Sequence, residues 1–303
     1  MPNQANSDSD VYLMSPPAPD WALRGRANFR SKDAEQVDPG IAFGEWLSLA
    51  RAIEAAGSRV IAHPHDSAMT GLPYCAEAGH PIAAQAGPMF LLPRMWAPHR
   101  QAEWNHWLTL TEALGFETFR GASGYWEGQG DVAEFDGKTL LFVGGRTNSA
   151  GLSAVRHFFA EDALVVEIRQ PAFHGNVAVL PVPGCDRLVV CPELLVSGYD
   201  QLVDAFGKDR IIEITEQEAR RYSTNALPVG QHLIAPSIAP QRVLDALADA
   251  GMNIVSLPMR ELCEKAGGAS RCLVCLIPGH VAANLELGAG TDLDTIASQR
   301  GQV

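Results

Sequence analysis

The sequence has no long hydrophobic run, although 47% of its 303 residues are hydrophobic. No apolar stretch approaches the roughly 20 residues that a helix needs to cross a bilayer. The first ten residues, MPNQANSDSD, are polar and acidic, whereas a signal peptide starts basic and continues apolar. We therefore expect a globular protein that does not enter a membrane and is located in the cytoplasm.

Basic residues are also few: 23 Lys and Arg stand against 35 Asp and Glu, which gives a formal net charge of −12. The basic residues form no cluster. A polyanion would therefore meet net repulsion, and we do not expect nucleic acid as a partner.

Cysteine is scarce, with six residues at positions 75, 185, 191, 263, 272 and 275. They lie mostly in apolar stretches, which favours reduced thiols over a disulfide framework. Cys272 and Cys275 form a Cys-x-x-Cys pair, but the surrounding RCLVCLIP is typical of a strand, whereas a thioredoxin-like motif opens a helix. No second pair completes a zinc site, so we expect no metal, and Cys275 is explained as a small core residue.

A helix followed by a strand recurs along the chain. Apolar residues at helical spacing over 44–56 lead to Gly57 and an apolar run at 59–62. The same succession is predicted at 102–114 and 117–119, 151–160 and 164–168, 199–206 and 210–214, and 240–250 and 253–257. Further short strands are predicted at 89–92, 139–143, 177–180, 188–190 and 233–235. Five such units indicate a repeated α/β architecture.

The two ends of the chain differ from this pattern. Residues 1 to about 38 are rich in Pro, Asp, Ser and Asn, which predicts an irregular segment that starts with a flexible tail at 1–13. We expect a single domain over 14–280. Residues 281–303 are rich in Gly, Ala and Asp, and predict a C-terminal extension with a short helix or a loose tail.

Polar residues in four segments call for explanation. Glu127 and Asp131 lie four residues apart among glycines, in GYWEGQGDV, where backbone can approach a ligand closely. A plain polar hairpin turn is the alternative. Arg146 follows a glycine pair at a strand end. It suits bidentate capture of a carboxylate, and the alternative is a solvated surface charge. His174 opens an apolar strand, where it is interpreted either as a proton carrier or as a structural residue.

Cys272 is the fourth of these. It follows the turn-forming pair Gly267-Gly268 and precedes an apolar run, so we expect a thiol at a loop-to-strand junction. Such a thiol is held by rigid structure and can be reached by a substrate. We therefore interpret Cys272 as the nucleophile, with a histidine and carboxylates upstream to activate it.

The order of these motifs resembles the guanidino-group-modifying enzymes, which include arginine deiminases, dimethylarginine dimethylaminohydrolases, arginine dihydrolases and amidinotransferases. The motifs are Glu-Gly-x-Gly-Asp, Gly-Arg-Thr-Asn, Phe-His and Gly-Gly-x-x-x-Cys. Two further segments agree: GLPYCAEAG resembles the one whose acidic or amide residue holds the guanidinium, here Glu77. LLPRMWAPHRQAE resembles the one whose arginine binds the substrate carboxylate, here Arg100.

The resemblance implies an α/β fold, a five-bladed α/β propeller (pentein) of ββαβ units with pseudo-fivefold symmetry. It implies that Cys272 attacks the guanidinium carbon and that His174 protonates the leaving nitrogen and then activates water. Glu127 and Glu77 would hold the guanidinium, and Arg100 and Arg146 would bind the carboxylate of a guanidino amino acid. Asp131 and Asn176 would complete the substrate site. No cofactor is needed, and a homodimer is compatible with the resemblance.

Two positions depart from the family pattern. His174-Gly175-Asn176 stands where the family usually has His-x-Asp, so one charged anchor is lost, at a cost of about 1–3 kcal/mol in a dry site. Glu77 replaces the more usual Asp or Asn. We therefore expect the pocket to fit a modified guanidine, or a different leaving group, instead of free arginine.

The sequence accordingly predicts a cysteine-dependent hydrolase that converts arginine or a substituted arginine to a ureido product. An amidinotransferase, in which an amine replaces water, stays open, as does a dihydrolase that removes both nitrogens. The alternative of another class is a non-catalytic binding protein on the same fold.

Overall fold

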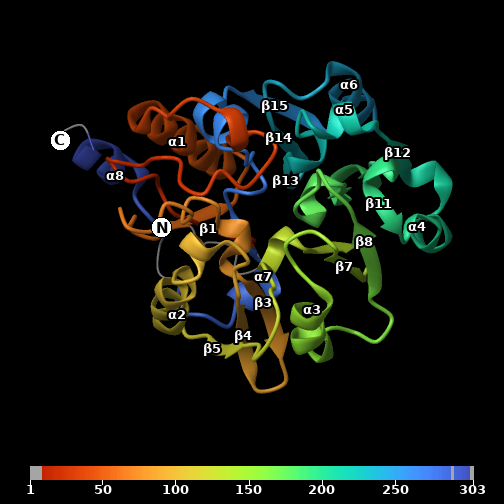
Figure 1. Ribbon diagram of the computed structural model, residues 1–303, viewed down its shortest axis with the longest axis horizontal. Coiled ribbons are helices and arrows are strands. Elements are labelled where there is room, and N and C mark those ends of the chain that lie inside the picture. The colour runs from red at the N-terminus through yellow and green to blue at the C-terminus, as the bar shows by residue number, and fades with distance from the viewer. Residues whose placement is uncertain (1–8, 288–289, 301–303) are drawn as a thin grey trace, which may run out of the picture.

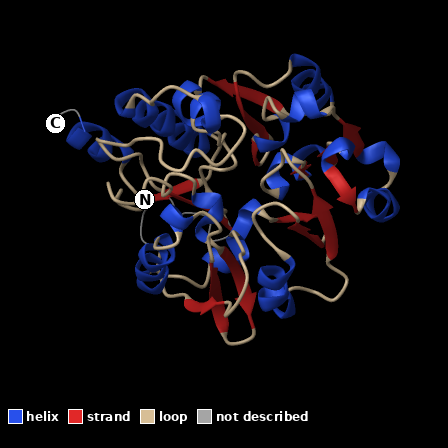
Figure 2. Ribbon diagram, in the orientation of Figure 1, coloured by secondary structure: helices blue, strands red, loops and turns tan. Residues whose placement is uncertain are grey.

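Five short sheets make up the β structure of the residues described by this computed structural model, 9–287 and 290–300 (Figure 2). The first sheet joins β1 (Val11–Met14), β2 (Arg59–Ala62) and β16 (Cys275–Ile277). The second holds β3 (His80–Ala84), β4 (Gly87–Leu92) and β5 (Glu117–Arg120). The third holds β6 (Val132–Phe135), β7 (Lys138–Val143), β8 (Leu164–Ile168) and β11 (Leu195–Ser197). The fourth holds β9 (Val179–Val182), β10 (Arg187–Val190) and β12 (Ile211–Glu213), and the fifth β13 (Leu227–Val229), β14 (His232–Pro236) and β15 (Asn253–Leu257).

Each sheet contains an antiparallel pair and a parallel pair. A helix connects the two parallel strands: α1 (Pro39–Ala55), α2 (Glu103–Ala113), α3 (Ser149–Val155), α4 (Tyr199–Phe206) and α6 (Gln241–Asp249) precede β2, β5, β8, β12 and β15. These helices lie toward the outside of the view in Figure 1. The other α-helices of the described residues are α5 (Glu216–Ala219), α7 (Gly279–Ala282) and α8 (Leu293–Arg300).

The five predicted helix-and-strand units are therefore present, and the structure is a mixed α/β fold. The arrangement of the sheets as a closed propeller with pseudo-fivefold symmetry stays a prediction. No helix of the described ranges is long and apolar enough to span a bilayer.

Helix α1 illustrates how local sequence sets these boundaries. The Asp38 carboxylate accepts hydrogen bonds from the backbone N–H of Gly40 and Ile41, at 2.8 and 2.9 Å, and so caps the helix start. Gly57, predicted as the stop, has a φ of +94° directly after the helix.

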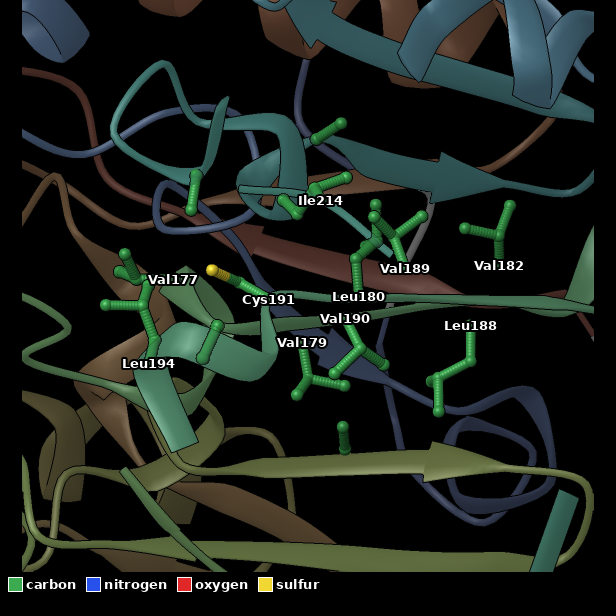
Figure 3. Close-up of a cluster of buried hydrophobic side chains, with 14 of the residues drawn as sticks. Val177, Val179, Leu180, Val182, Leu188, Val189, Val190, Cys191, Leu194 and Ile214 are labelled. Atoms are coloured by element: carbon green, nitrogen blue, oxygen red, sulfur yellow. The ribbon is translucent and has the colours of Figure 1, made fainter. Parts of the chain in front are cut away.

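The core is divided among the sheets. Figure 3 shows one cluster, in which the fourth sheet packs its valine and leucine side chains. All four residues of β9 and the last three of β10 are buried, which explains their nearly continuous apolar sequence.

The first sheet joins strands that lie far apart in the sequence, β1 and β16. Strand β1 pairs in parallel with β2 and antiparallel with β16, with Leu13 opposite Cys275. We predicted an irregular segment up to about residue 38, and this was wrong for β1, which is buried throughout. The division into 1–13, 14–280 and 281–303 stays a prediction; residues 1–8, 288–289 and 301–303 lie outside the described residues.

Two further local predictions were wrong. The run RCLVCLIP is not one strand, because β16 begins only at Cys275 and Cys272 lies in the preceding turn. His174 does not open a strand: a short 3-10 turn, Gly175–Val177, separates it from β9. In both cases tertiary contacts take the backbone N–H groups that a strand would have paired.

Candidate active site

Cys272 lies in the turn between Gly268 and β16, and only 1% of its surface is exposed. Gly267 has a φ of +93°, which favours glycine. Gly268 allows a close approach, because a Cβ there would overlap the ring of Tyr74 and lie 3.1 Å from the Cβ of Cys272. The glycine pair thus delivers the cysteine, as the sequence indicated, but into a turn.

Asn225 holds this turn in place. Its side-chain oxygen accepts hydrogen bonds from the backbone N–H of Ala269 and Cys272, at 3.1 and 3.2 Å. Its amide nitrogen donates to the carbonyl of Asn176 at 3.3 Å, and its own carbonyl accepts from the backbone of Arg271 at 3.0 Å. Asn225 is fully buried, so it fixes the turn of Cys272 relative to the segment that carries Asn176.

The thiol of Cys272 is protonated near neutral pH. Burial raises its pKa to about 12, and the Glu77 carboxylate adds to this shift. The amides of Asn225 and Asn176 oppose it weakly, the latter with its nitrogen 3.6 Å from the sulfur. The thiol therefore needs an approaching cation or a base before it can attack.

His174 lies among three carboxylates and is fully buried. Its Nε2 is 2.7 Å from Glu127 Oε2 and 4.0 Å from Asp131 Oδ2, while its Nδ1 is 3.3 Å from Glu77 Oε1. Gly130 makes room for the ring, because a Cβ there would lie about 3.0 Å from the imidazole. The sequence motifs around Glu77, Glu127 and His174 thus do meet in space.

These contacts set the charges of the group. Burial lowers the pKa of His174, but Asp131, Glu77 and Glu127 more than offset it and raise the pKa to about 9. Burial raises the pKa of Glu127, yet the hydrogen bond from His174 and the charge of Arg146 bring it down to about 2. Near neutral pH, His174 is an imidazolium paired with the Glu127 carboxylate.

Asp131 supports the position of His174 from behind. One of its oxygens accepts from the Thr147 hydroxyl at 2.6 Å and the other from the backbone N–H of Gly175 at 2.8 Å. Burial raises its pKa to about 6. Asp131 thereby orients the residue that follows His174 rather than facing a cavity.

Arg100 forms a buried ion group with Glu77 and Glu103. Its Nη1 donates to Glu77 Oε2, and its Nη2 donates to Glu103 Oε2 at 2.8 Å and to the Gly71 carbonyl at 3.0 Å. Its Nε donates to both oxygens of Glu103, at 3.0 and 3.1 Å. Burial lowers the pKa of Arg100, but Glu103 and Glu77 raise it overall, so the guanidinium stays charged.

The Arg146 guanidinium makes fewer hydrogen bonds within the protein than that of Arg100. Its backbone N–H donates to the Phe173 carbonyl at 2.9 Å, and its guanidinium lies 4.7 Å from the centre of the Phe173 ring. Its Nη1 is 3.7 Å from Glu127 Oε2, and its buried Nε has no hydrogen-bond partner. A donor group is therefore available for an anion that enters beside it.

A cavity of about 70 Å³ brings several of these residues to a common surface. Its wall combines the Cys272 thiol, the Glu77 carboxylate and arginine side chains with apolar side chains of the 22–31 segment. The residues that line it are Ala22, Leu23, Arg24, Ala27, Asn28, Ser31, Gly71, Tyr74, Glu77, Ala97, His99, Arg100, Arg146, Phe173, Ala266, Gly267, Gly268 and Cys272.

The eight predicted site residues fall into two groups. Cys272, Glu77, Arg100 and Arg146 line the cavity. His174, Glu127, Asp131 and Asn176 do not line it and form the buried layer that contacts Glu77, Arg146 and Cys272. No group of three or more His, Cys, Asp or Glu residues within 9–287 and 290–300 is arranged to hold a metal ion.

Several residues of the site were missed from the sequence. Asn225 stands in a short polar run before β13 that matches none of the motifs, and Glu103 ends the segment LLPRMWAPHRQAE, in which the resemblance implies a role for Arg100 alone. Arg24 lines the cavity from an irregular segment and His99 from the short turn Pro98–Arg100. Only their neighbours in space reveal them, because no local pattern links a loop residue to a distant turn.

The structure is similar to solved structures of enzymes that act on guanidino compounds. The N-terminal domain of ArgZ, described as a cyanobacterial arginine dihydrolase and solved as a cysteine-to-serine variant with substrate, matches with a TM-score of 0.81 at 20% identity, over 89% of this chain and 98% of that one. A complex of an AgrE cysteine-to-alanine variant with L-arginine matches with a TM-score of 0.80 at 19% identity, over 89% of this chain and 40% of AgrE. An adduct of dimethylarginine dimethylaminohydrolase with S-methyl-L-thiocitrulline matches with a TM-score of 0.69 at 17% identity, over 88% and 99% of the two chains.

This chain shares the fold of ArgZ, AgrE and dimethylarginine dimethylaminohydrolase. In sequence it is 25% identical over 241 residues to the uncharacterized protein ZK1307.1 of Caenorhabditis elegans, which covers 78% of this chain and 84% of that protein. No protein-family model matches the chain.

Proposed function

We propose that this protein is a cysteine-dependent hydrolase of the guanidino group of arginine or a substituted arginine. The observation that carries the proposal is that Cys272 and Glu77 line one cavity while Glu77 contacts His174, which is paired with Glu127. A nucleophile, an acceptor for a guanidinium and a proton carrier therefore lie within one group of side chains.

The first step joins the sulfur of Cys272 to the guanidinium carbon. A guanidinium held by Glu77 next to the thiol lowers the pKa of Cys272, so that the thiol gives its proton to a water molecule and the thiolate adds to the carbon. His174 then gives its proton to one nitrogen, and the bond from carbon to that nitrogen breaks. Ammonia or an amine departs, and an amidino group remains bound to sulfur.

The second step reverses the role of His174. Neutral His174 takes a proton from a water molecule that attacks the amidino carbon, and the carbon–sulfur bond breaks to give a ureido product. Glu127 keeps the imidazole oriented through both steps, since it lies 2.7 Å from Nε2. His174 itself does not line the cavity. Its proton therefore reaches the substrate from the part of the wall that Glu77 forms, since Glu77 contacts His174.

Two further residues of the cavity wall fit an anionic group. Arg24 and Arg146 line the cavity, and Arg146 has an unpartnered Nε. A carboxylate beside these cations and a guanidinium beside Glu77 together favour an arginine-like amino acid over a simple guanidine. Small apolar side chains at Ala22, Ala27 and Ala266 suit the aliphatic chain between the two charged ends.

The similar structures support this proposal by their chemistry. One is the N-terminal domain of ArgZ covalently bound to a reaction intermediate, and it matches over 88% of this chain with a TM-score of 0.79. We further propose that the five sheets are blades of one propeller whose funnel holds the cavity, in a single domain over 14–280.

The test is turnover of arginine, methylated arginines and other guanidino acids, with ammonia, ureido product and ornithine measured. We expect ureido product from the wild type, a loss of at least about 10³-fold in Cys272→Ser, and near-normal turnover in Cys275→Ser. Ornithine as the product would identify a dihydrolase, and product formed only with an added amine an amidinotransferase. Absence of turnover for every guanidino compound would contradict the proposal.

A further inference from the structure

The most unusual feature beside the proposed nucleophile is a cation enclosed by two carboxylates. Arg100, Glu77 and Glu103 are 5%, 2% and 0% exposed, and they contact each other directly. Buried ions persist when they are paired and hydrogen-bonded, and this group satisfies both conditions. Glu103 is the member that never reaches the cavity.

The N–H groups of Arg100 are almost fully committed within the protein. Nε and Nη2 serve Glu103 and the Gly71 carbonyl, and Nη1 serves Glu77. A guanidinium has five N–H donors, of which these contacts use four. A substrate carboxylate would therefore have to displace Glu77 or Glu103 before it could bind Arg100 in bidentate form.

Local structure keeps this arrangement in place. Arg100 ends the short turn Pro98–Arg100, and Glu103 follows in the first turn of α2, so the two are three residues apart on consecutive turns. Gly71 packs against both: a Cβ there would overlap Arg100 Nε and Glu103 Oε1. The backbone thus provides a fitted space for the pair, rather than a flexible arginine that swings toward a ligand.

We propose that Arg100 and Glu103 are positioning residues that hold Glu77 for the substrate guanidinium. Arg100 fixes one oxygen of Glu77, while the other oxygen faces His174 at 3.3 Å. Charge explains why Glu103 is needed. Glu103 shares the charge of Arg100, so Glu77 keeps more of its own negative charge for a cationic guanidinium beside Cys272.

This inference rests on the proposed function and replaces the role in carboxylate binding that the family resemblance implies for Arg100. The two roles differ in what their loss does. A residue that only binds a distant carboxylate affects KM and leaves kcat unchanged, because it acts equally on ground state and transition state. A residue that orients Glu77 affects kcat, because a misplacement of about 1 Å near the reacting atoms costs about 10²-fold.

The experiment compares Glu103→Gln and Arg100→Lys with wild type on whichever guanidino compound the wild type turns over best. Glu112→Gln is the matched control, since Glu112 lies on the same helix and is exposed. We expect Glu103→Gln and Arg100→Lys to lower kcat by at least about tenfold. Glu103→Asp, which keeps the charge, should recover part of the loss, and Glu112→Gln should stay within about twofold of wild type.

A pH profile gives a second readout that a purely structural role would not change. Removal of the Glu103 charge weakens the negative field on the Glu77–His174 pair, so the limb of the kcat profile that reports His174 should move to lower pH in Glu103→Gln. It should not move in Glu112→Gln. If Glu103→Gln fails to fold by circular dichroism, Arg100→Lys carries the kcat readout on its own.

A rise in KM with unchanged kcat in Arg100→Lys, together with wild-type kinetics in Glu103→Gln or Glu103→Asp, would overturn the inference and leave the hydrolase intact. A wild type that turns over no guanidino compound would instead remove the proposed function, and the inference with it.

Discussion

His174 is a residue whose ionisation the fold controls strongly. Its neighbours Asp131, Glu77 and Glu127 raise its pKa from 6.5 to about 9 against the effect of burial. A group whose pKa is higher in the folded state stabilises the fold fully below its unfolded pKa, and this contribution is lost as pH rises through the folded pKa. The free energy of unfolding should therefore decrease between about pH 6.5 and 9, by roughly 3 kcal/mol at 1.4 kcal/mol per pKa unit.

Urea unfolding at a series of pH values measures this decrease. His280→Gln, at an exposed histidine, should keep the slope, whereas His174→Gln should remove it. A wild-type stability that stays flat from pH 6.5 to 9 would mean that His174 is not held as an imidazolium.

Asn225 gives a second prediction at the scale of the residue. Asn225→Asp keeps an oxygen for the N–H groups of Ala269 and Cys272 but places a negative charge beside the thiol. The pKa of Cys272 should rise further, so the rate of alkylation by iodoacetamide at pH 8 should fall by about tenfold for each unit of pKa shift. Asn105→Asp, an exposed position, adds the same charge far from the thiol and serves as control. Equal alkylation rates in both variants would contradict the role of Asn225.

The sequence allowed some of these residues to be predicted and not others. Cys272, His174, Glu127 and Glu77 stand in short motifs whose order could be compared with a family. Asn225 stands in no such motif, and the resemblance implies no role for Glu103. Asn225 acts on residues 44 and 47 positions away, a separation that no local pattern encodes. Glu103 contacts Arg100 only three residues away, but the role of that pair depends on Glu77, which Arg100 contacts across 23 positions.

At the scale of the element, the turn from Gly267 to Cys272 depends on its glycines. Gly268→Ala would push the new methyl group into the Tyr74 ring, close to Cys272, and we expect activity to fall by about 10²-fold and stability by about 1–3 kcal/mol. The control is Gly44→Ala within α1, where a Cβ meets nothing within 4 Å. It should stabilise the protein by about 0.5–1 kcal/mol.

Turnover and thermal unfolding measured on both variants test whether the turn requires glycine at position 268. Unchanged activity in Gly268→Ala would show that the turn tolerates a shift of Tyr74, and that its glycine is not required for the site.

The elements themselves were predicted well where their pattern was periodic. The helix over 44–56 and its stop at Gly57 were confirmed by α1, because amphipathic spacing and a glycine with positive φ are local signals. Strand β1 was missed because it has only four residues and is stabilised by pairing with β2 and with the distant β16. The extent of the strand near Cys272 was wrong because Asn225 takes the N–H of Cys272.

At the scale of the whole molecule, four sheets have the same succession of hairpin, helix and parallel strand, and side chains from distant segments meet at one cavity. The first sheet has no hairpin and is completed by β16, which directly follows the turn of Cys272. Cys272 is thus placed by the pairing of β1 with the distant β16, and periodicity in sequence could indicate the repeats but not this pairing.

The most direct test of the account is to trap the covalent intermediate. The protein is mixed with the guanidino compound that it turns over, quenched in acid, and its peptides are analysed by mass spectrometry, with Cys272→Ser and Cys275→Ser in parallel. We predict an amidino adduct on Cys272 in the wild type and in Cys275→Ser, and none in Cys272→Ser. An adduct on Cys275, or turnover without any adduct on Cys272, would contradict the central claim that Cys272 is the nucleophile.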